Sequence, residues 1–165
     1  SHGTTGIERL LIGSTTIATM KNIHYPVIVV PPGTRYQGIK KIGLACDYKN
    51  VIESTPVDFI KSIVTAFDAE LHVLNIYDDD DEKQLSGTPL ESAYLETLLG
   101  DIEPSYYFLE DDDVVERINA FAEKSNLDMI MVIPKKRNLF EKIFHKSKSK
   151  ELVTHAHIPI VSIHE

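Results

Sequence analysis

The residues best suited to chemistry lie in the first fourteen positions of the chain. Gly3 is followed by nine residues and then by Gly13 and Ser14. Glycines let a backbone approach a phosphate closely, and a helix N-terminus supplies N–H donors and positive potential. The hydroxyl of Ser14 would add another donor. Taken alone, this spacing favours an ordinary turn glycine and helix glycine, because glycine pairs are common.

The surrounding sequence shifts the interpretation toward a phosphate-binding loop. Small polar residues flank Gly3, a helix-like run follows Gly13, and the apolar stretch 27–30 then predicts a buried strand. This order of loop, helix and strand is what an anion site at a helix N-terminus requires.

The sequence pattern of this loop, helix and strand recurs near the other end of the chain, 133 positions later and without a gap. The repeat relates four pairs of identical residues: Glu8 and Glu141, Ser14 and Ser147, His24 and His157, and Pro26 and Pro159. An internal repeat of this length decides the architecture of a chain. The sequence therefore predicts the end of one unit over residues 1–33 and a complete second unit over 36–165.

These motifs resemble the universal stress protein family. Its members carry Gly-two-Gly-nine-Gly-Ser/Thr, then a helix, then a strand of the Pro-Val-Ile-Val-Val type. Gly3 matches the second family glycine, Gly13 the third and Ser14 the hydroxyl residue, while the first glycine would immediately precede Ser1. The resemblance implies a tandem member that lacks most of its first domain, with residues 1–33 as the helix–strand remnant of that domain. In members with the intact motif, these residues hold the phosphates of ATP.

The second unit alternates between strand-like and helix-like segments. Short apolar runs predict five strands, and apolar residues at helical spacing predict helices between them. Thr55 and Pro56 are typical of a capped helix start with proline in the first helical position. Such alternation predicts an α/β fold with a mostly parallel sheet and helices on both faces. The expected strands are 39–46, 71–77, 106–109, 129–133 and 160–163. The family resemblance implies the same five-stranded fold, which is the adenine-nucleotide alpha hydrolase-like kind.

The second unit departs from the phosphate motif. The repeat places Lys136 at the position of Gly3 and Lys146 at that of Gly13, and only Ser147 survives, at the position of Ser14. One hypothesis is that the site is lost and the unit is structural. The other is that Lys135, Lys136 and Arg137 bind phosphate directly through their charge. We favour the loss, because basic surface stretches are usually solvated.

Two further residues of the second unit are candidates for contact with a nucleotide. Asp47 ends the first predicted strand, where family members place an aspartate that meets the adenine or ribose. Ala45 lies two positions earlier, where a small side chain would suit a flat base. A turn aspartate and a packing alanine are the structural alternatives. The candidate site of this unit thus comprises Ala45, Asp47, Lys136 and Ser147.

Net charge, hydropathy and cysteine content limit the kinds of partner and compartment that suit the chain. The net charge of −8 opposes binding to nucleic acid or anionic lipid, and no apolar run approaches the length of a membrane span. Cys46 is the single cysteine, which suits a reducing cytoplasm, and it is expected to be a buried core thiol. No residues stand at a recognised metal-ligand spacing, so Mg²⁺ is expected only as a companion of ATP or another adenine nucleotide.

These observations favour a stress-response binding protein without catalytic residues. The intact first domain would bind the nucleotide, and the second would serve structure or dimerisation. Strands 27–30 and 160–163 are predicted to pair, either in a homodimer or within one chain as a pseudo-dimer. Two alternatives remain: a nucleotide hydrolase or transferase that uses Glu8 or Glu141, and a dimerisation scaffold that binds no nucleotide.

Overall fold

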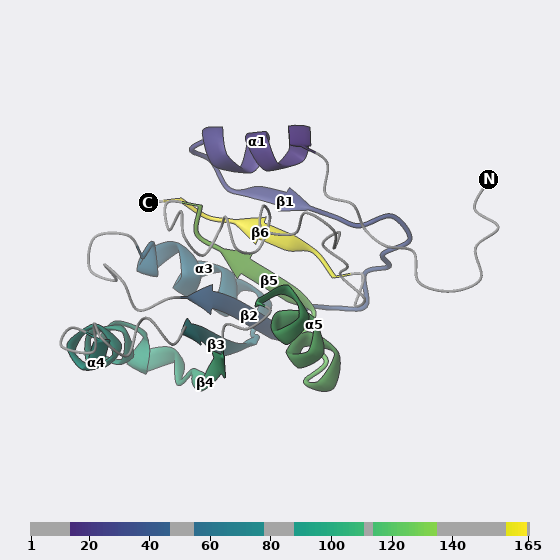
Figure 1. The fold of residues 1–165 in the computed structure, drawn as a ribbon. Helices are drawn as coiled ribbons and strands as arrows, with labels where there is room; N and C mark the ends of the chain where they lie inside the picture. The colour runs from purple at the N-terminus through teal and green to yellow at the C-terminus, as the bar shows by residue number, and fades with distance from the viewer. Residues whose placement is uncertain (1–13, 47–54, 78–87, 111–113, 135–157, 165) are drawn as a thin grey trace.

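The structure is a computed structural model, in which the chain forms one twisted sheet between helices (Figure 1). It describes residues 14–46, 55–77, 88–110, 114–134 and 158–164.

Five of the strands are parallel and form the body of the sheet. Neighbouring strands follow the order β1-β6-β5-β2-β3-β4, and all pairs from β6 to β4 are parallel. The predicted α/β fold with a mostly parallel sheet is confirmed, and each predicted strand is found to within a few residues. The five are β2 (Lys41–Cys46), β3 (Glu70–Tyr77), β4 (Ser105–Glu110), β5 (Met129–Val132) and β6 (Ile160–Ser162).

A sixth strand joins the sheet from the N-terminal segment. Strand β1 (Val27–Val29) pairs antiparallel with β6 of the same chain. Its partners are Ser162 for Val27, Val161 for Ile28 and Ile160 for Val29. The sheet is therefore mixed, with one strand more than the second unit alone was expected to supply. Pairing between two copies of the chain stays a prediction.

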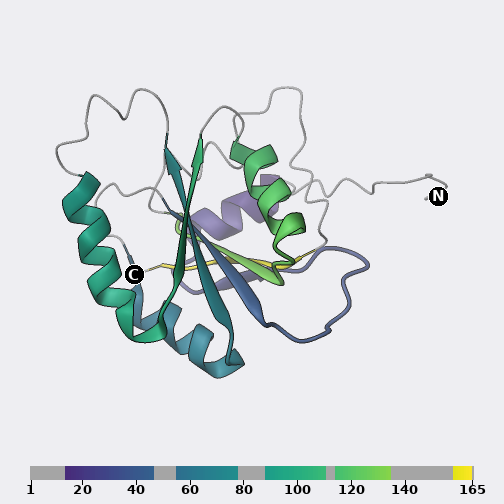
Figure 2. The same ribbon diagram turned by 90° about the horizontal axis from the view of Figure 1, so that it is seen from below.

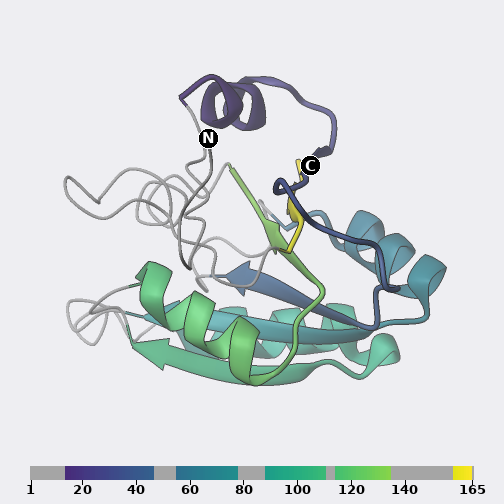
Figure 3. The ribbon, with the colours of Figure 1, turned by 90° about the vertical axis from the view of Figure 1, so that its right-hand side faces the viewer.

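Helices cover both faces of the sheet, as Figures 2 and 3 show. One face carries α3 (Val57–Phe67) and α4 (Thr88–Leu99), which continues into a 3-10 turn over Gly100–Ile102. The other face carries α1 (Ser14–Asn22) and α5 (Val114–Lys124). This arrangement explains why the strands read as continuous apolar runs, since both of their faces are buried.

Alternation along β2 divides the core into two clusters. Leu44 and Cys46 belong to the cluster beneath α3 and α4, which includes Ile60 and Leu95. Ala45 belongs to the cluster beneath α1 and α5, which includes Met20 and Leu74. Because successive strand residues point to opposite faces, a single strand supplies both clusters.

The start of α3 differs from the prediction. Pro56 precedes the helix with φ −79° and ψ 72°, and no side chain caps the N-terminus. The Thr55 hydroxyl is buried and has no hydrogen-bond partner among the described residues. Proline fixes φ but leaves ψ open, so a favourable φ did not make Pro56 helical. Instead the carbonyl of Pro56 accepts the first helical bond, from the N–H of Ile60 at 3.1 Å.

Candidate functional site

The carboxyl edge of the parallel strands is where this fold would hold a ligand. The chain leaves β2 toward β3 on one side and later returns to place β5 on the other side of β2. The carboxyl ends of β2 and β5 therefore mark the point where the strand order reverses. Open α/β sheets bind ligands at such points.

Ala45 lies at this edge, one residue before the end of β2, but its side chain is fully buried. It packs in the cluster that contains Leu74, Ile76 and Val132. The structure therefore shows Ala45 as a packing residue. The other candidates of this unit, Asp47, Lys136 and Ser147, lie outside the described residues, so the structure does not show whether the four come together.

The second candidate site is the N-terminus of α1. Gly3 and Gly13 lie outside the described residues, as does the side chain of Ser14, but the helix itself begins at Ser14. Its first turn contains no acidic residue. The positive end of the helix, whose first N–H groups have no partner within the helix, therefore has no carboxylate of that turn beside it, which favours an anion there.

Helix α1 is held against the last strand by buried contacts. Met20 is fully buried in the cluster on this face, and Ile17 packs against the same cluster. Beyond the sheet, His164 Nε2 lies 3.0 Å from the carbonyl oxygen of Met20, and the His164 ring meets His24 edge-on at 5.9 Å. These contacts fix the C-terminal end of α1 beside the end of β6.

The two candidate sites lie at opposite edges of the sheet. Helix α1 runs back along β1, so that its Ser14 end lies toward the carboxyl end of β1 (Figure 1). Because β1 is antiparallel to β6, this end lies at the amino edge of the other five strands. Any ligand at Ser14 is thus separated by the length of the strands from a ligand near Ala45.

The register between β1 and β6 agrees with the sequence repeat. Ile28 pairs with Val161, and these two residues are equivalent under the repeat. The repeat also makes Val27 equivalent to Ile160 and Val29 equivalent to Ser162. It therefore converts the pair Val27–Ser162 into the pair Val29–Ile160. A contact in which equivalent residues exchange roles is isologous and has a two-fold axis. Here the local axis passes between Ile28 and Val161.

A cavity of about 850 Å³ lies at the amino edge of the sheet, away from the point where the strand order reverses. Residues 30 and 32–39 form one wall, and the end of α5, residues 126–128 and residues 158–159 form the rest. Gly33 and Gly38 shape this wall with φ values of 78° and 90°, which favour glycine. The carboxylate of Asp128 accepts hydrogen bonds from the N–H groups of Lys40 and Lys41, at 2.9 and 3.0 Å. Sequence reasoning missed this cavity, because its walls are distant in the chain and only the two glycines gave a local signal.

Sequence reasoning also missed a buried polar group beside Cys46. Cys46 is fully buried, as predicted, and Asn75 is its neighbour on β3. Neither Asn75 Oδ1 nor the Tyr106 hydroxyl has a hydrogen-bond partner among the described residues. Burial raises the pKa of the Tyr106 hydroxyl to about 12, and the nearby charges of Glu96 and Cys46 add to the rise. No cluster of three or more metal-ligating side chains occurs in the described part of the chain.

The sequence model of the universal stress protein family matches residues 38–164, well over half of the chain. The chain belongs to the universal stress protein family. This confirms the family that the glycine loop and the repeat predicted. No curated protein matches the chain. Across the described ranges, no helix combines the length and the apolar character needed to cross a membrane.

Solved universal stress proteins share the fold at low sequence identity. One from Archaeoglobus fulgidus is 14% identical with a TM-score of 0.61, and the alignment covers 93% of this chain and 55% of that protein. A putative one from Pseudomonas aeruginosa is 14% identical with a TM-score of 0.63, covering 93% and 57%. A family protein from Burkholderia pseudomallei is 15% identical with a TM-score of 0.50, covering 79% and 100%. The chain thus spans just over half the length of the first two.

Proposed function

We propose that this universal stress protein binds ATP or another adenine nucleotide through the segment from Gly3 to Ser14 and acts in the stress response as a cytoplasmic binding protein, not an enzyme. The observation that carries the proposal is the start of α1 at Ser14, immediately after Gly13, with no acidic side chain in its first turn. A helix end of this kind stabilises phosphate, and glycine permits the close approach that phosphate contact needs.

The second unit, residues 36–165, takes a structural role in this proposal. Lys136 and Lys146 replace the two glycines of the motif. Ala45 is enclosed by core side chains. A side chain in place of a loop glycine obstructs close backbone contact with phosphate. Mg²⁺ would enter only with the nucleotide, because the described residues offer no metal cluster of their own.

The proposal includes two units in one polypeptide, with residues 1–33 ending the first. The isologous register of β1 and β6 supports this arrangement, because it relates the two strands as equivalent ends of two units. The alignments with this chain cover just over half of the Archaeoglobus fulgidus and Pseudomonas aeruginosa proteins and the whole of the Burkholderia pseudomallei protein. These lengths are consistent with two units in one polypeptide. The loop of the first unit without the rest of that unit should bind nucleotide weakly.

Calorimetric titration of the chain with ATP tests the location of the site. We expect weak binding that is lost in Gly13→Asp, since a carboxylate at the start of α1 repels phosphate. Binding should be unchanged in Lys136→Ala, which alters the basic segment of the second unit. Submillimolar binding that disappears in Lys136→Ala would instead assign the site to the basic segment. Phosphate release that falls in Glu8→Gln would favour the hydrolase alternative.

A scaffold that binds no nucleotide is the second candidate function. The β1–β6 contact favours it, because an isologous strand pair joins two units without any ligand. Absence of binding to ATP, ADP and AMP in the same titration would support this candidate.

A further inference from the structure

We propose that the outer edge of β4 binds an extended, basic peptide segment of a partner protein, which adds to the sheet as a further strand. The β4 edge comprises the backbone of Ser105–Glu110 and the exposed side chains of Glu96, Glu103 and Phe108. It is separated from β2 by β3, and it lies at the border of the sheet opposite β1. Binding there is therefore independent of any nucleotide.

Strand β4 has a neighbouring strand on one side only. All six of its residues pair in parallel with β3, from Ser105 opposite His72 to Glu110 opposite Tyr77. The described residues place no strand on its other side, and Figure 3 shows β4 as the outermost strand of the sheet. Alternate residues of such a strand direct their N–H and C=O groups outward, where a further strand can pair with them.

The sequence of β4 does not block its outer edge. Proteins commonly protect sheet edges with proline, lysine or a β-bulge. Strand β4 reads Ser-Tyr-Tyr-Phe-Leu-Glu, and its register with β3 is continuous. Phe108 is 62% exposed, whereas β5 and β6 are buried along their whole length. The β4 edge is thus rich in strand-forming residues and open to a partner.

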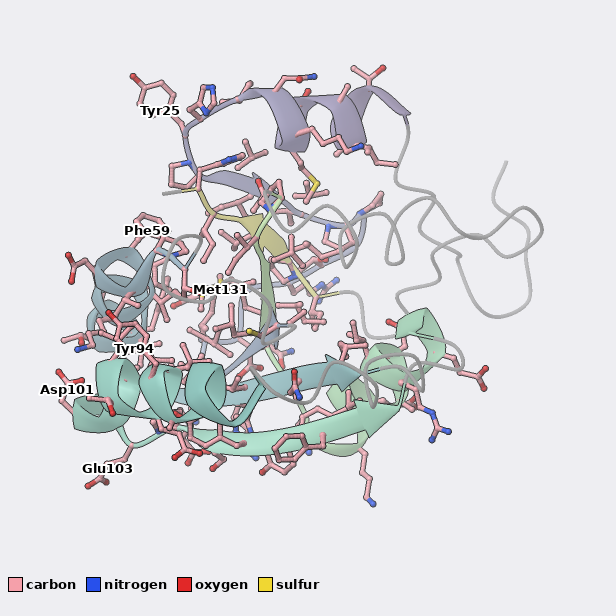
Figure 4. The ribbon with its side chains drawn as sticks, turned by 60° about the vertical axis from the view of Figure 1, so that its left-hand side comes forward. Tyr25, Phe59, Tyr94, Asp101, Glu103 and Met131 are labelled. Atoms are coloured by element: carbon pink, nitrogen blue, oxygen red, sulfur yellow. The ribbon has the colours of Figure 1, made fainter. Side chains whose placement is uncertain are left out.

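Acidic side chains dominate the α4 side of this edge. The charge of Glu96 in α4 adds to the effect of burial in raising the pKa of the Tyr106 hydroxyl, which places Glu96 beside β4. Asp101 and Glu103 lie in the turn that leads into β4, and Figure 4 shows both projecting outward. Lys61 Nζ pairs with Asp101 at 2.8 Å. Three carboxylates and one ammonium give this side a net charge of −2.

The α5 side of the β4 edge carries no such excess of charge. Helix α5 covers this side through Phe121, whose ring lies 4.6 Å from that of Tyr107. The exposed charged residues of α5 come in neighbouring pairs of opposite sign: Glu116 with Arg117, and Glu123 with Lys124. The negative charge of the edge is therefore concentrated on the α4 side.

A basic segment with one apolar residue fits this pattern. When a peptide adds to a sheet edge, main-chain hydrogen bonds supply affinity and alternate side chains supply specificity. An apolar residue opposite Phe108 would cover its exposed ring. Residues two and four positions away lie on the same face, toward the amino end of β4. Basic side chains at those positions would meet Glu96 and Glu103.

A second copy of the chain fits the β4 edge less well. The chain has a net charge of −8. Antiparallel pairing of two β4 edges about a two-fold axis would place both acidic α4 sides on one face of the joined sheet. The same carboxylates therefore oppose pairing between copies and favour a basic partner.

Fluorescence anisotropy of a labelled peptide tests the proposal. The probe is Lys-Thr-Lys-Thr-Val-Thr-Lys-Thr-Lys, whose symmetric pattern fits either strand direction. We expect saturable binding that weakens at least about fivefold between about 50 mM and about 300 mM salt, because the charges are exposed. Replacing every Lys of the peptide by Glu, or its two central Thr by Pro, should abolish binding, since Pro removes main-chain donors.

Variants of the chain locate the site. Glu103→Lys should weaken binding about tenfold, because it places like charge beside the basic peptide. Glu123→Lys makes the same change at a residue that lines the cavity at the amino edge, and it should alter binding less than about twofold. Phe108→Ala should weaken binding at least about threefold. Amide hydrogen exchange in β4 should slow when the peptide binds, which a purely electrostatic contact would not cause.

Four outcomes would overturn the proposal. The first is absence of saturable binding below about 1 mM peptide. The second is equal weakening by Glu103→Lys and Glu123→Lys, which would indicate general attraction to an acidic protein. The third is unchanged hydrogen exchange in β4 on binding. The fourth is a dimer of the chain without peptide that Phe108→Ala abolishes, which would identify a second copy as the occupant.

Discussion

Tyr106 shows how the environment of one side chain sets its behaviour. Its ring packs against the cluster beneath α3 and α4, and its hydroxyl is buried with no hydrogen-bond partner in the described part of the chain. Burial, with smaller effects from Glu96 and Cys46, raises the pKa of this hydroxyl to about 12. The folded state therefore favours the protonated form of Tyr106.

We predict that Tyr106→Phe keeps or slightly raises stability at pH 8, by up to about 1 kcal/mol, because it removes an unpaired buried hydroxyl. The variant should also be less sensitive to alkali. Since the pKa is raised on folding, its contribution to stability is fully present below the pKa of the unfolded chain, near 10, and is lost as pH rises through about 12.

Urea denaturation at pH 8 and pH 11 measures both effects. The wild type should lose more stability than Tyr106→Phe between these two values. Tyr25→Phe is the matched control, because Tyr25 is 78% exposed and its change should leave stability unaltered at pH 8. An equal loss in the wild type and Tyr106→Phe would contradict the assignment.

Individual residues also mark the limit of sequence reasoning. The burial of Cys46 was predictable, because it stands in an apolar run that reads as a strand buried on both faces. The surroundings of Ala45, Asn75 and Tyr106 were not, since they depend on which helices cover each face and on pairing between distant strands. For the same reason the sequence could propose a base-contacting role for Ala45 without foreseeing that core side chains enclose it.

Elements were more predictable than their contacts. The apolar runs of the second unit placed all five parallel strands, and the repeat indicated the equivalence of β1 and β6. The start of α3 was misplaced, because Pro56 has a non-helical ψ that its type does not determine. The antiparallel register of β1 on β6 could not be derived from either strand alone. The register indicates a two-fold relation between the two strands only when it is compared with the sequence repeat.

At this scale we predict that the same truncation destabilises the chain much more in β6 than in β1. Val161→Ala should destabilise the chain by about 1–3 kcal/mol, because it removes buried methyl groups beneath α3. Ile28→Ala, at the equivalent position, should change stability by less than about 0.5 kcal/mol, because Ile28 is 58% exposed. Urea denaturation measures both variants. Equal destabilisation would show that the outward face of β1 is already covered in this chain.

At the scale of the whole molecule, the N-terminal and C-terminal strands meet in one mixed sheet. Strand β1 extends the parallel sheet by one antiparallel strand, and its residues Ile28 and Val30 stay exposed. The two candidate ligand sites consequently lie at opposite edges, with the start of α1 at one and the end of β2 at the other. This separation allows a single measurement to assign binding to one unit or the other.

That measurement is the change in amide chemical shifts of the ¹⁵N-labelled chain on titration with ATP, which detects weak binding and locates it. Our account predicts progressive shifts at the start of α1, from Ser14 to Thr16, with none at the end of β2 or in residues 135–147. Shifts confined to Ala45, Asp47 and residues 135–147, or no shift at any residue, would contradict it.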